Sequence, residues 1–512
     1  MIPGVANILK VSLEDLPYEL KNCFLHCALF PEDYEMKRRR LTRHWITSGF
    51  IKEKENKTLE QVAEGYLIDL VNRSLLIVVR KNECGRVKCF RMHDVIRHLA
   101  IDKATKECFG KIYEGHGTFS LYGTRRLSIQ CSNIVPLNQS NAASLRAIFV
   151  FSSYININLL RPILSSSILL STLDLEGTPV KVLPNEVFSL FNLRFLGLRN
   201  TAIEILPEAI GRLQNLEVLD ALGTGLVSLP KDVVKLKKLR YLYAYGVNVN
   251  VGGFIHHVGV KVPRGIRHLT RLHALQKVTA SLETLCDVAA LTELRTFAVS
   301  KVTSEHSVTL CKAIMNMSHL AHLSVDASNE NEVLPLEAFR LPETLYRLEL
   351  TGQLDKAHIP QIFSSWSHHN NLAILNFRSS KLNEDSFTSL VALRDLCCLQ
   401  LGWAYDGKSM CFPAESFPRL RTLLIAGALQ LNQVRIEEGA LKSLFDLRFI
   451  NCPELKYVPH GIENIMTLEE LYLRDISEEL TEKLRQEREA DECNEELMKI
   501  RHIRKVVVSM SY

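Results

Sequence analysis

The sequence predicts an α/β leucine-rich-repeat solenoid (horseshoe) preceded by a small α+β winged-helix domain, and two observations carry this prediction. Most of the chain repeats the pattern L-x-x-L-x-[LIVFA], at intervals close to the range of about 20 to 29 residues that is typical of leucine-rich repeats. The first hundred residues follow a helical period instead. With 512 residues, the chain also exceeds the roughly 250 to 300 residues at which single cores stop growing.

The repeats keep a strict register along the chain. The leading leucines of four successive units are 23 residues apart: Leu170, Leu193, Leu216 and Leu239. The prolines of three Leu-Pro pairs keep the same interval: Pro184, Pro207 and Pro230. Further units begin at Leu145, Leu272, Leu294, Leu320, Leu345, Leu372, Leu396, Leu420, Leu444 and Leu468. Because side chains alternate along each L-x-L strand, the leucines point inward, and stacked units bury them in one continuous core.

Two segments depart from the repeat. Between Tyr245 and Leu272 the repeat step lengthens to 33 residues over a stretch rich in Gly and Val, which predicts an inserted loop or hairpin near 246–271. The highly charged C-terminal stretch predicts a polar helical cap on the open end of the array, with a partner-binding helix as the alternative. The predicted organisation is a winged-helix domain at 1–110, a linker at 111–124, repeats at 125–475 and a charged cap at 476–512.

The first hundred residues contain three predicted helices and a hairpin. Helical spacing of apolar residues predicts one helix before residue 30, a short second helix from Thr42, and a third after a capping box formed by Thr58 and Gln61. Two strands, at 75–79 and 87–91, follow on either side of a polar turn. This order of helices and strands is that of a winged helix.

A winged helix invites a DNA-binding hypothesis, because helices of this kind can enter the major groove. The run Lys37-Arg38-Arg39-Arg40 supports it, but the run precedes the predicted second helix, and such a run is typical of a solvated turn. The net charge of +5 is also too balanced for a nucleic-acid surface over the whole chain. We therefore do not expect nucleic acid as a partner. A DNA-binding regulator stays the alternative, which a salt-sensitive duplex interaction would support.

Three motifs in order, CFLHCALFPEDYEM, LTRHWITSGFI and RMHDVIRHLA, resemble the winged-helix subdomain at the C-terminal end of the NB-ARC domain in plant nucleotide-binding leucine-rich-repeat disease resistance receptors of the coiled-coil class. The repeats after them match the same family. The resemblance implies an innate immune receptor of the plant defense response. In that family this subdomain clamps ADP and holds the receptor inactive, while the repeats sense a pathogen effector or a modified host protein. We expect a protein partner of that kind, with a full-length receptor as a second candidate.

His93 and Asp94 match the family's Met-His-Asp motif, in which the histidine is implied to contact the phosphate of ADP. On physical grounds, Asp94 is placed to cap the following helix, and a histidine beside a helix N-terminus lies where anions are favoured. The alternative is an ordinary helix cap with a neighbouring histidine.

The residues that would hold the rest of a nucleotide are not found in this sequence. It contains no G-x-x-x-x-G-K-[ST] loop and no hydrophobic strand that ends in paired aspartates. We expect a receptor fragment truncated at its N-terminus, with no cofactor of its own, that binds ADP or ATP only if the missing N-terminal subdomains are supplied. The alternative is a complete receptor with ADP/ATP switching whose N-terminal half is missing from this sequence.

Partner binding is expected on the strand residues displayed between the inward leucines. Alternation puts Tyr241, Tyr243 and Tyr245 on the displayed side of one strand, and tyrosines are enriched in binding hot spots. Trp403 and Tyr405, directly after another strand, are weaker candidates. The alternative is that these aromatic residues pack against the inserted hairpin.

The sequence favours a cytoplasmic binding protein over an enzyme. It has no nucleophile elbow G-x-S-x-G and no H-E-x-x-H motif, so we predict neither a catalytic residue nor a metal site. The sequence contains no run of eighteen or more uncharged apolar residues, so it predicts no membrane span. The thirteen scattered cysteines fit free thiols in a reducing compartment.

Overall fold

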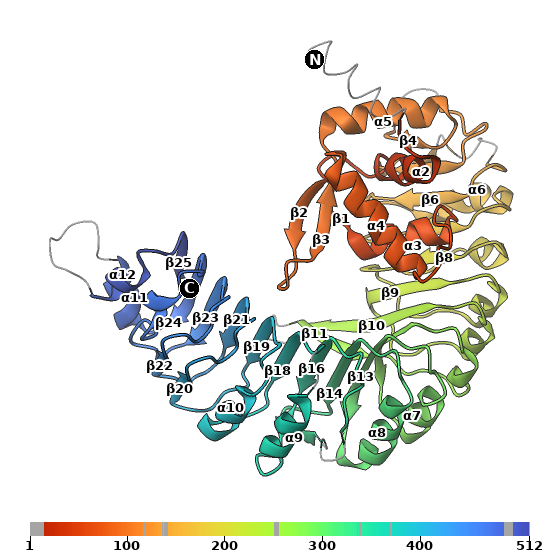
Figure 1. Cartoon of the computed structure of the whole chain (residues 1–512). Helices are drawn as coiled ribbons and strands as arrows, with labels where there is room; N and C mark the ends of the chain where they lie inside the picture. The colour runs from red at the N-terminus through yellow and green to blue at the C-terminus, as the bar shows by residue number, and fades with distance from the viewer. Residues whose placement is uncertain are drawn as a thin grey trace. The chain divides into compact units, whose positions relative to one another are not determined.

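The computed structural model describes residues 15–115, 119–135, 137, 142–249, 255–334, 336, 339–368, 371–485 and 495–510. The chain forms two compact units, Met1–Val278 and Thr279–Tyr512. In both units the main structure is a row of short parallel strands, one from each repeat (Figure 1).

The first unit begins with a small domain of helices and short strands. Its elements are α2 (Tyr18–Cys27), β1 (Met36–Lys37), α3 (Arg38–Thr47), α4 (Leu59–Asn72), β2 (Ile77–Lys81), β3 (Val87–Arg91) and α5 (Asp94–Lys106). The three strands form an antiparallel sheet in the order β1-β3-β2, which is the predicted winged helix. Thr58 and Gln61 form the predicted capping box, and this exchange of hydrogen bonds fixes where α4 starts.

Helix α3 begins at Arg38 rather than at the predicted Thr42, so it contains most of the basic run. Met36 and Lys37 pair with β3, and the helix follows directly. The prediction that the basic run forms a solvated turn before the helix is therefore wrong. Arg40 is buried, because carboxylates of the repeats compensate its charge.

Parallel strands from successive repeats form the rest of the first unit. In pairing order they are β4 (Lys111–Tyr113), β5 (Arg126–Ile129), β6 (Ala147–Val150), β7 (Thr172–Asp174), β8 (Phe195–Gly197), β9 (Val218–Thr224), β10 (Tyr241–Val249) and β12 (Ala274–Thr279). From β6 onward, each begins two residues after a predicted leading leucine, which confirms the register. Strand β4 comes from the segment predicted as a linker.

The Leu-Pro pairs start the return path between strands. A short 3-10 turn follows each of Pro184, Pro207 and Pro230, whose fixed φ suits the entry to a helical turn. The leucine before each proline is buried, so each pair anchors the return path to the core. At the predicted insertion, β10 pairs antiparallel with β11 (Ile255–Gly259), which confirms a hairpin; residues 250–254 lie outside the described residues.

The second unit continues the repeat with further parallel strands (Figure 1). In pairing order these are β13 (Thr296–Val302), β14 (His322–Ala327), β16 (Arg347–Thr351), β18 (Ile374–Arg378), β19 (Cys398–Gly402), β21 (Thr422–Ala426), β23 (Asp446–Cys452), β24 (Glu470–Ile476) and β25 (Lys505–Ser509). Helices lie in several of its return segments, among them α7 (Leu282–Val288), α8 (Ser307–Met315), α9 (Ile359–Trp366) and α10 (Glu384–Leu390). Short strands in neighbouring return segments also pair with each other: β15 (Val333–Leu334) with β17 (Gln353–Leu354), and β20 (Ser409–Phe412) with β22 (Gln433–Ile436).

The charged C-terminal stretch differs from a purely helical cap. Helices α11 (Glu478–Arg485) and α12 (Glu495–Ile500) are followed by β25, which pairs parallel with β24. Residues 486–494 lie outside the described residues. Ile503 takes the place of the leading leucine two residues before β25, so the repeat extends past the end that leucine spacing predicted.

Candidate functional site

The His93–Asp94 pair lies at the exposed start of α5. His93 is the N-cap: its Nδ1 accepts a hydrogen bond from the backbone N–H of Val95 at 3.3 Å, and Asp94 is the first helical residue. The expectation that Asp94 caps this helix is therefore wrong, because the histidine ring occupies the cap position. Since Nδ1 accepts, the ring hydrogen of the neutral imidazole lies on Nε2, a donor that suits a phosphate oxygen.

The displayed strand face of the first repeats carries the winged-helix domain. Ala147 and Phe149 of β6 belong to the hydrophobic core of that domain. The ring of His44 in α3 lies edge-on against Phe195 of β8, with 4.4 Å between the ring centroids. Gly197 gives the Asp174 carboxylate room, since a Cβ there would lie 2.5 Å from Asp174 Oδ1. The two domains therefore share one core.

Arg40 of α3 is buried among carboxylates of the repeats. Its Nε donates to Asp174 Oδ2 at 2.7 Å and lies 3.2 Å from Glu176 Oε2. Lys37 also donates to Glu176, at 2.7 Å. Because charges removed from water are tolerated only when paired, these contacts specify how α3 lies on the strands. The basic residues that suggested DNA binding here contact carboxylates of the same chain.

A second ionic contact lies one turn further along α3. Arg43 Nη1 lies 3.4 Å from Asp220 Oδ2 in β9, and Nη2 donates to the Tyr243 hydroxyl at 2.6 Å. The Arg43 guanidinium also lies 4.1 Å from the centre of the Tyr243 ring, within range of a cation–π interaction. In the first turn of α4, Glu60 accepts hydrogen bonds from Arg240 at 2.8 Å and from the Tyr241 hydroxyl.

Two of the predicted partner-binding tyrosines are thus buried by the chain's own winged-helix domain. Tyr241 and Tyr243 are 9% and 4% exposed, and Tyr245 is half-buried. The sequence analysis expected these rings to contact either a partner or the inserted hairpin. It did not expect contact with the winged-helix domain. Their role in partner binding stays a prediction. A partner could reach these rings only if α3 moved away from the repeat strands.

Sequence reasoning missed the acidic side of this contact, Asp174 and Asp220. Both follow the second leucine of their repeats, which is a displayed position. An acidic residue at the same position of two repeats, in a chain with a compact basic run elsewhere, is the signal that could have paired them. Nothing in the sequence indicates which repeats the basic run meets.

Two buried histidines extend the ionic contact into the winged-helix core. His44 Nε2 lies 2.9 Å from Asp174 Oδ2, and His26 Nε2 lies 3.2 Å from His44 Nδ1. Burial lowers the pKa of both histidines, and for His44 the nearby Asp174 offsets this only in part. Burial raises the pKa of Asp174, but Arg40 and His44 together lower it by more. While α3 lies docked on the repeat strands, His26 and His44 are therefore neutral and Asp174 is ionised.

The two weaker candidates, Trp403 and Tyr405, have different surroundings. Trp403 follows β19 and is 50% exposed. Tyr405 is buried: its ring meets Phe387 edge-on, and its hydroxyl donates to the Ser409 carbonyl. The structure therefore contradicts partner binding by Tyr405, because the residue packs inside the repeats. For Trp403 the prediction stands.

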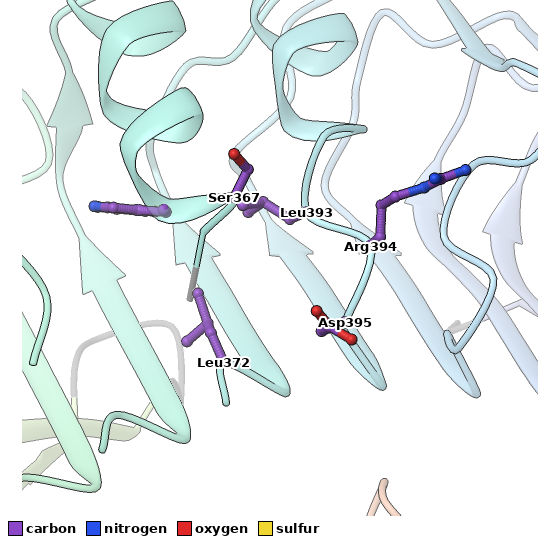
Figure 2. Close-up of a pocket in the computed structure, with 6 residues that line it drawn as sticks. Ser367, Leu372, Leu393, Arg394 and Asp395 are labelled. Atoms are coloured by element: carbon purple, nitrogen blue, oxygen red, sulfur yellow. The ribbon is translucent and has the colours of Figure 1, made fainter. Parts of the chain in front are cut away.

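The described residues include a small cavity in the second unit and an open groove in the first unit. One cavity is lined by Trp366, Ser367, Leu372, Leu393, Arg394 and Asp395 (Figure 2). Its volume of about 10 Å³ holds at most one water molecule. An open groove of about 450 Å³ lies between two Leu-Pro turns, at 204–208 and 228–231.

Within the described ranges, no group of three or more His, Cys, Asp or Glu side chains is placed to hold a metal ion. Of the helices in those ranges, none combines the length and apolar character that crossing a bilayer requires.

Comparison with known proteins identifies both domains. Residues 29–100 match the family model of the disease resistance protein winged helix domain, and residues 144–502 match that of a leucine-rich repeat region. Disease resistance protein RPM1 of Arabidopsis thaliana is 38% identical over 495 residues, which cover 95% of this chain and 52% of that protein. The probable disease resistance protein RXW24L of the same plant is 28% identical over 485 residues, which cover 92% and 52%. The chain spans about half the length of the curated relatives it matches.

The matched segments coincide with the two structural parts that share one core. The winged-helix model covers the domain that carries Arg40 and Arg43, and the repeat model covers the strands that carry Asp174 and Asp220. The chain belongs to the plant disease resistance proteins in which a winged-helix domain precedes a leucine-rich-repeat region.

Proposed function

We propose that this chain recognises a protein partner, a pathogen effector or a modified host protein, as the sensing half of a cytoplasmic plant immune receptor, and that it catalyses no reaction. Family membership supports this role, and stacked repeats supply extended binding surfaces. The observation that carries the proposal is that the displayed strand face already holds a protein domain through the buried pairs Arg40–Asp174 and Arg43–Asp220. A face that binds one protein domain in this way is chemically suited to bind another.

The same contact gives the receptor a resting state in this proposal. A partner that contacted Asp174, Asp220 and Tyr243 would compete with α3 for them. Removing one member of a buried ion pair is strongly unfavourable, because the other charge is left without compensation. A cationic group of the partner that replaced Arg40 or Arg43 beside the aspartates would avoid this cost. Partner binding and release of the winged helix are therefore coupled.

A nucleotide role for His93 is conditional on subdomains outside this sequence. The chain offers one donor, the His93 Nε2–H, beside the N-terminus of α5, where anions are favoured. Asp94 stabilises the positive end of that helix dipole. We propose that His93 adds one phosphate contact to an ADP site that other subdomains build. Isothermal titration of ADP into this chain should show no tight binding, and tight binding would overturn this part.

The main test is a cell-death assay in leaf cells, with the chain joined to the N-terminal half of a matching relative. Asp174→Arg places a cation against Arg40 and should undock α3, so that cell death begins without a pathogen effector. The double variant Asp174→Arg, Arg40→Asp restores opposite charges and should return the receptor to silence.

The matched control replaces the acidic member of a solvent-accessible pair, Arg419–Asp395, whose nitrogen and oxygen lie 2.8 Å apart. Asp395→Arg should leave the receptor silent, because exposed pairs contribute little. If Asp174→Arg and Asp395→Arg behave alike at equal protein levels, the docked winged helix does not control signalling and the proposal fails.

A further inference from the structure

The seventh residue after each leading leucine has a left-handed backbone in ten repeats. These residues are Gly177, Asn200, Gly223, Lys301, Gly352, Ser379, Trp403, Gly427, Asn451 and Asp475. Glycine adopts this conformation without strain, and asparagine and aspartate tolerate it. Trp403, with φ 48°, is the aromatic member of the row. A bulky residue held in a strained conformation is a reason to look for a function there.

Trp403 is held in place and yet remains open to solvent. Its backbone N–H donates to the Ala426 carbonyl at 2.6 Å. Its indole lies against Gly427, where a Cβ would come within 2.5 Å of the ring. Half of the side chain stays exposed. The ring is thus fixed on the backbone of the next repeat, which lowers the entropy that a partner contact would cost.

Beside Trp403, the last displayed residues of five paired strands form a row with a low, apolar centre. In register these residues are Arg378, Gly402, Ala426, Ile450 and Arg474. Four strand spacings separate the two arginines, roughly 19 Å. We call this row together with Trp403 the tryptophan shelf. The shelf has the length of a short extended peptide segment.

Arg378 gives one end of the shelf an uncompensated positive charge. Other displayed arginines have a carboxylate partner on their own strand: Arg347 donates to Glu349, and Arg448 donates to Asp446 at 2.8 Å. At the other end of the shelf, Arg474 Nε lies 3.5 Å from Asp475 Oδ2. Two residues before Arg378, its strand carries Asn376. Its side chain is exposed, it leans over Gly402, and no described residue forms an ion pair or hydrogen bond with it.

We infer that the tryptophan shelf binds an extended segment of the protein partner in which an apolar side chain stands next to a carboxylate. The apolar side chain lies on Gly402, Ala426 and Ile450 against the Trp403 indole. The carboxylate pairs with Arg378, whose planar guanidinium can hold both oxygens. This inference rests on the proposed recognition function and names the chemistry of the segment recognised.

The first test measures, in the absence of a partner, how readily charged quenchers reach Trp403 in the shelf. The chain has three tryptophans, and Trp45 and Trp366 are 0% and 1% exposed. Collisional quenching of fluorescence therefore reports Trp403. Iodide, an anion, should quench more than caesium, and Arg378→Gln should reduce the iodide effect. Arg419→Gln, which removes an exposed arginine paired with Asp395, should not. Equal quenching by iodide in wild type and Arg378→Gln would remove the charge argument.

The second test selects random displayed peptides on the full chain and measures the binding of the enriched peptides by fluorescence polarisation. Enriched peptides should carry Phe, Trp, Leu or Met beside Asp or Glu. Trp403→Asn and Arg378→Gln should each weaken their binding more than about tenfold. Asn occurs at the matching position of other repeats, as in Asn451, so Trp403→Asn should fold normally. Tyr457→Asn alters another half-exposed aromatic residue and is the matched control.

The outcomes separate the shelf from the proposed function. No enrichment, enrichment of basic peptides, or binding that survives both Trp403→Asn and Arg378→Gln would overturn the shelf. None of these results depends on the docked winged helix, which the cell-death assay tests through Asp174. A receptor that passes that assay while the shelf fails here recognises its partner elsewhere on the repeats.

Discussion

Arg40 and Asp174 illustrate at the residue scale how a buried charge pair acts. Removing one member leaves the other charge without compensation in a low-dielectric setting. Asp174→Ala should lower the free energy of unfolding of the first unit by about 3–5 kcal/mol in chemical denaturation. Replacing both members by apolar residues, as in Arg40→Met with Asp174→Leu, should cost clearly less than Asp174→Ala.

The control for that prediction is Asp395, whose side chain is partly exposed. Its loss from the pair with Arg419 should cost less than about 1 kcal/mol. Equal costs for Asp174→Ala and Asp395→Ala would show that the Arg40 pair is solvated rather than buried.

The neutral histidines His26 and His44 predict that docking is sensitive to acid. Their pKa values are lowered in the folded chain, chiefly by burial, so below about pH 6.5 the unfolded chain binds more protons than the folded one. Stability therefore falls as the pH drops below that value. The ionised Asp174 adds a loss in the same direction, but only near and below about pH 3.9.

The charged groups facing these histidines are Arg40, Arg126, Asp174 and Glu176. His26→Phe removes one of the two buried imidazoles and should therefore flatten the pH dependence of the denaturation midpoint between about pH 7.5 and 5.5. A phenylalanine ring suits this position, because the neighbouring rings are already phenylalanines. His98→Gln changes an exposed histidine on α5 and should leave the pH dependence unchanged. A midpoint that is independent of pH in the wild-type chain would contradict the buried neutral pair.

At the scale of an element, substitution of alanine at two glycines with the same backbone conformation should destabilise the protein by different amounts. Gly177 and Gly461 have φ 79° and 87°. A Cβ at Gly177 meets nothing within 4 Å, whereas one at Gly461 clashes with the carbonyl oxygen of Ile436 in the neighbouring return segment. Gly177→Ala should cost about 1–2 kcal/mol, from the left-handed backbone alone.

Gly461→Ala should cost distinctly more, because the backbones of two repeats must separate. Thermal unfolding of the two variants and of the wild-type chain, followed by circular dichroism, compares the two losses of stability. If the two substitutions cost the same, the close approach at Gly461 relaxes freely and the repeats are less tightly stacked than described.

Repeat elements were predictable where leucine itself marks them. The strands β6 to β10 begin two residues after their leading leucines, as spacing predicted. Strand β25 has the same pattern with Ile503 in place of leucine, so a search for any aliphatic residue would have found it. Helix α3 started earlier than predicted because β1 pairs with a strand about fifty residues further on, which local spacing does not contain.

At the scale of the whole molecule, the shared core ties the winged helix to the first repeats. Phe149 lies in the winged-helix core, and repeat stability depends on nearest neighbours. Deletion of residues 1–110 should speed hydrogen exchange in β6 to β10, where Tyr241 and Tyr243 become exposed. Exchange in β18 to β24 should not change, and mass spectrometry of the full and shortened chains measures both.

Exchange that rises equally in both units would mean that the chain unfolds as one cooperative block. Exchange that rises in neither would mean that the winged helix contributes nothing to the repeats. The second unit serves as the internal control in the same experiment, so differences in sample handling cancel.

The sequence by itself determined the repeat, its register, the winged helix, the place of the insertion and the family, and the structure decided that the insertion is a hairpin. Each feature that the sequence determined depends on residues close together in the chain, such as the leucines of one unit or the capping box at Thr58. Only the tertiary structure decided that Arg40 meets Asp174, that Tyr243 is covered, that Tyr405 is buried and that Trp403 stands open beside Arg378. These are contacts between residues up to two hundred positions apart, or between neighbouring repeats. Such contacts follow from how surfaces pack, and local spacing carries no record of them.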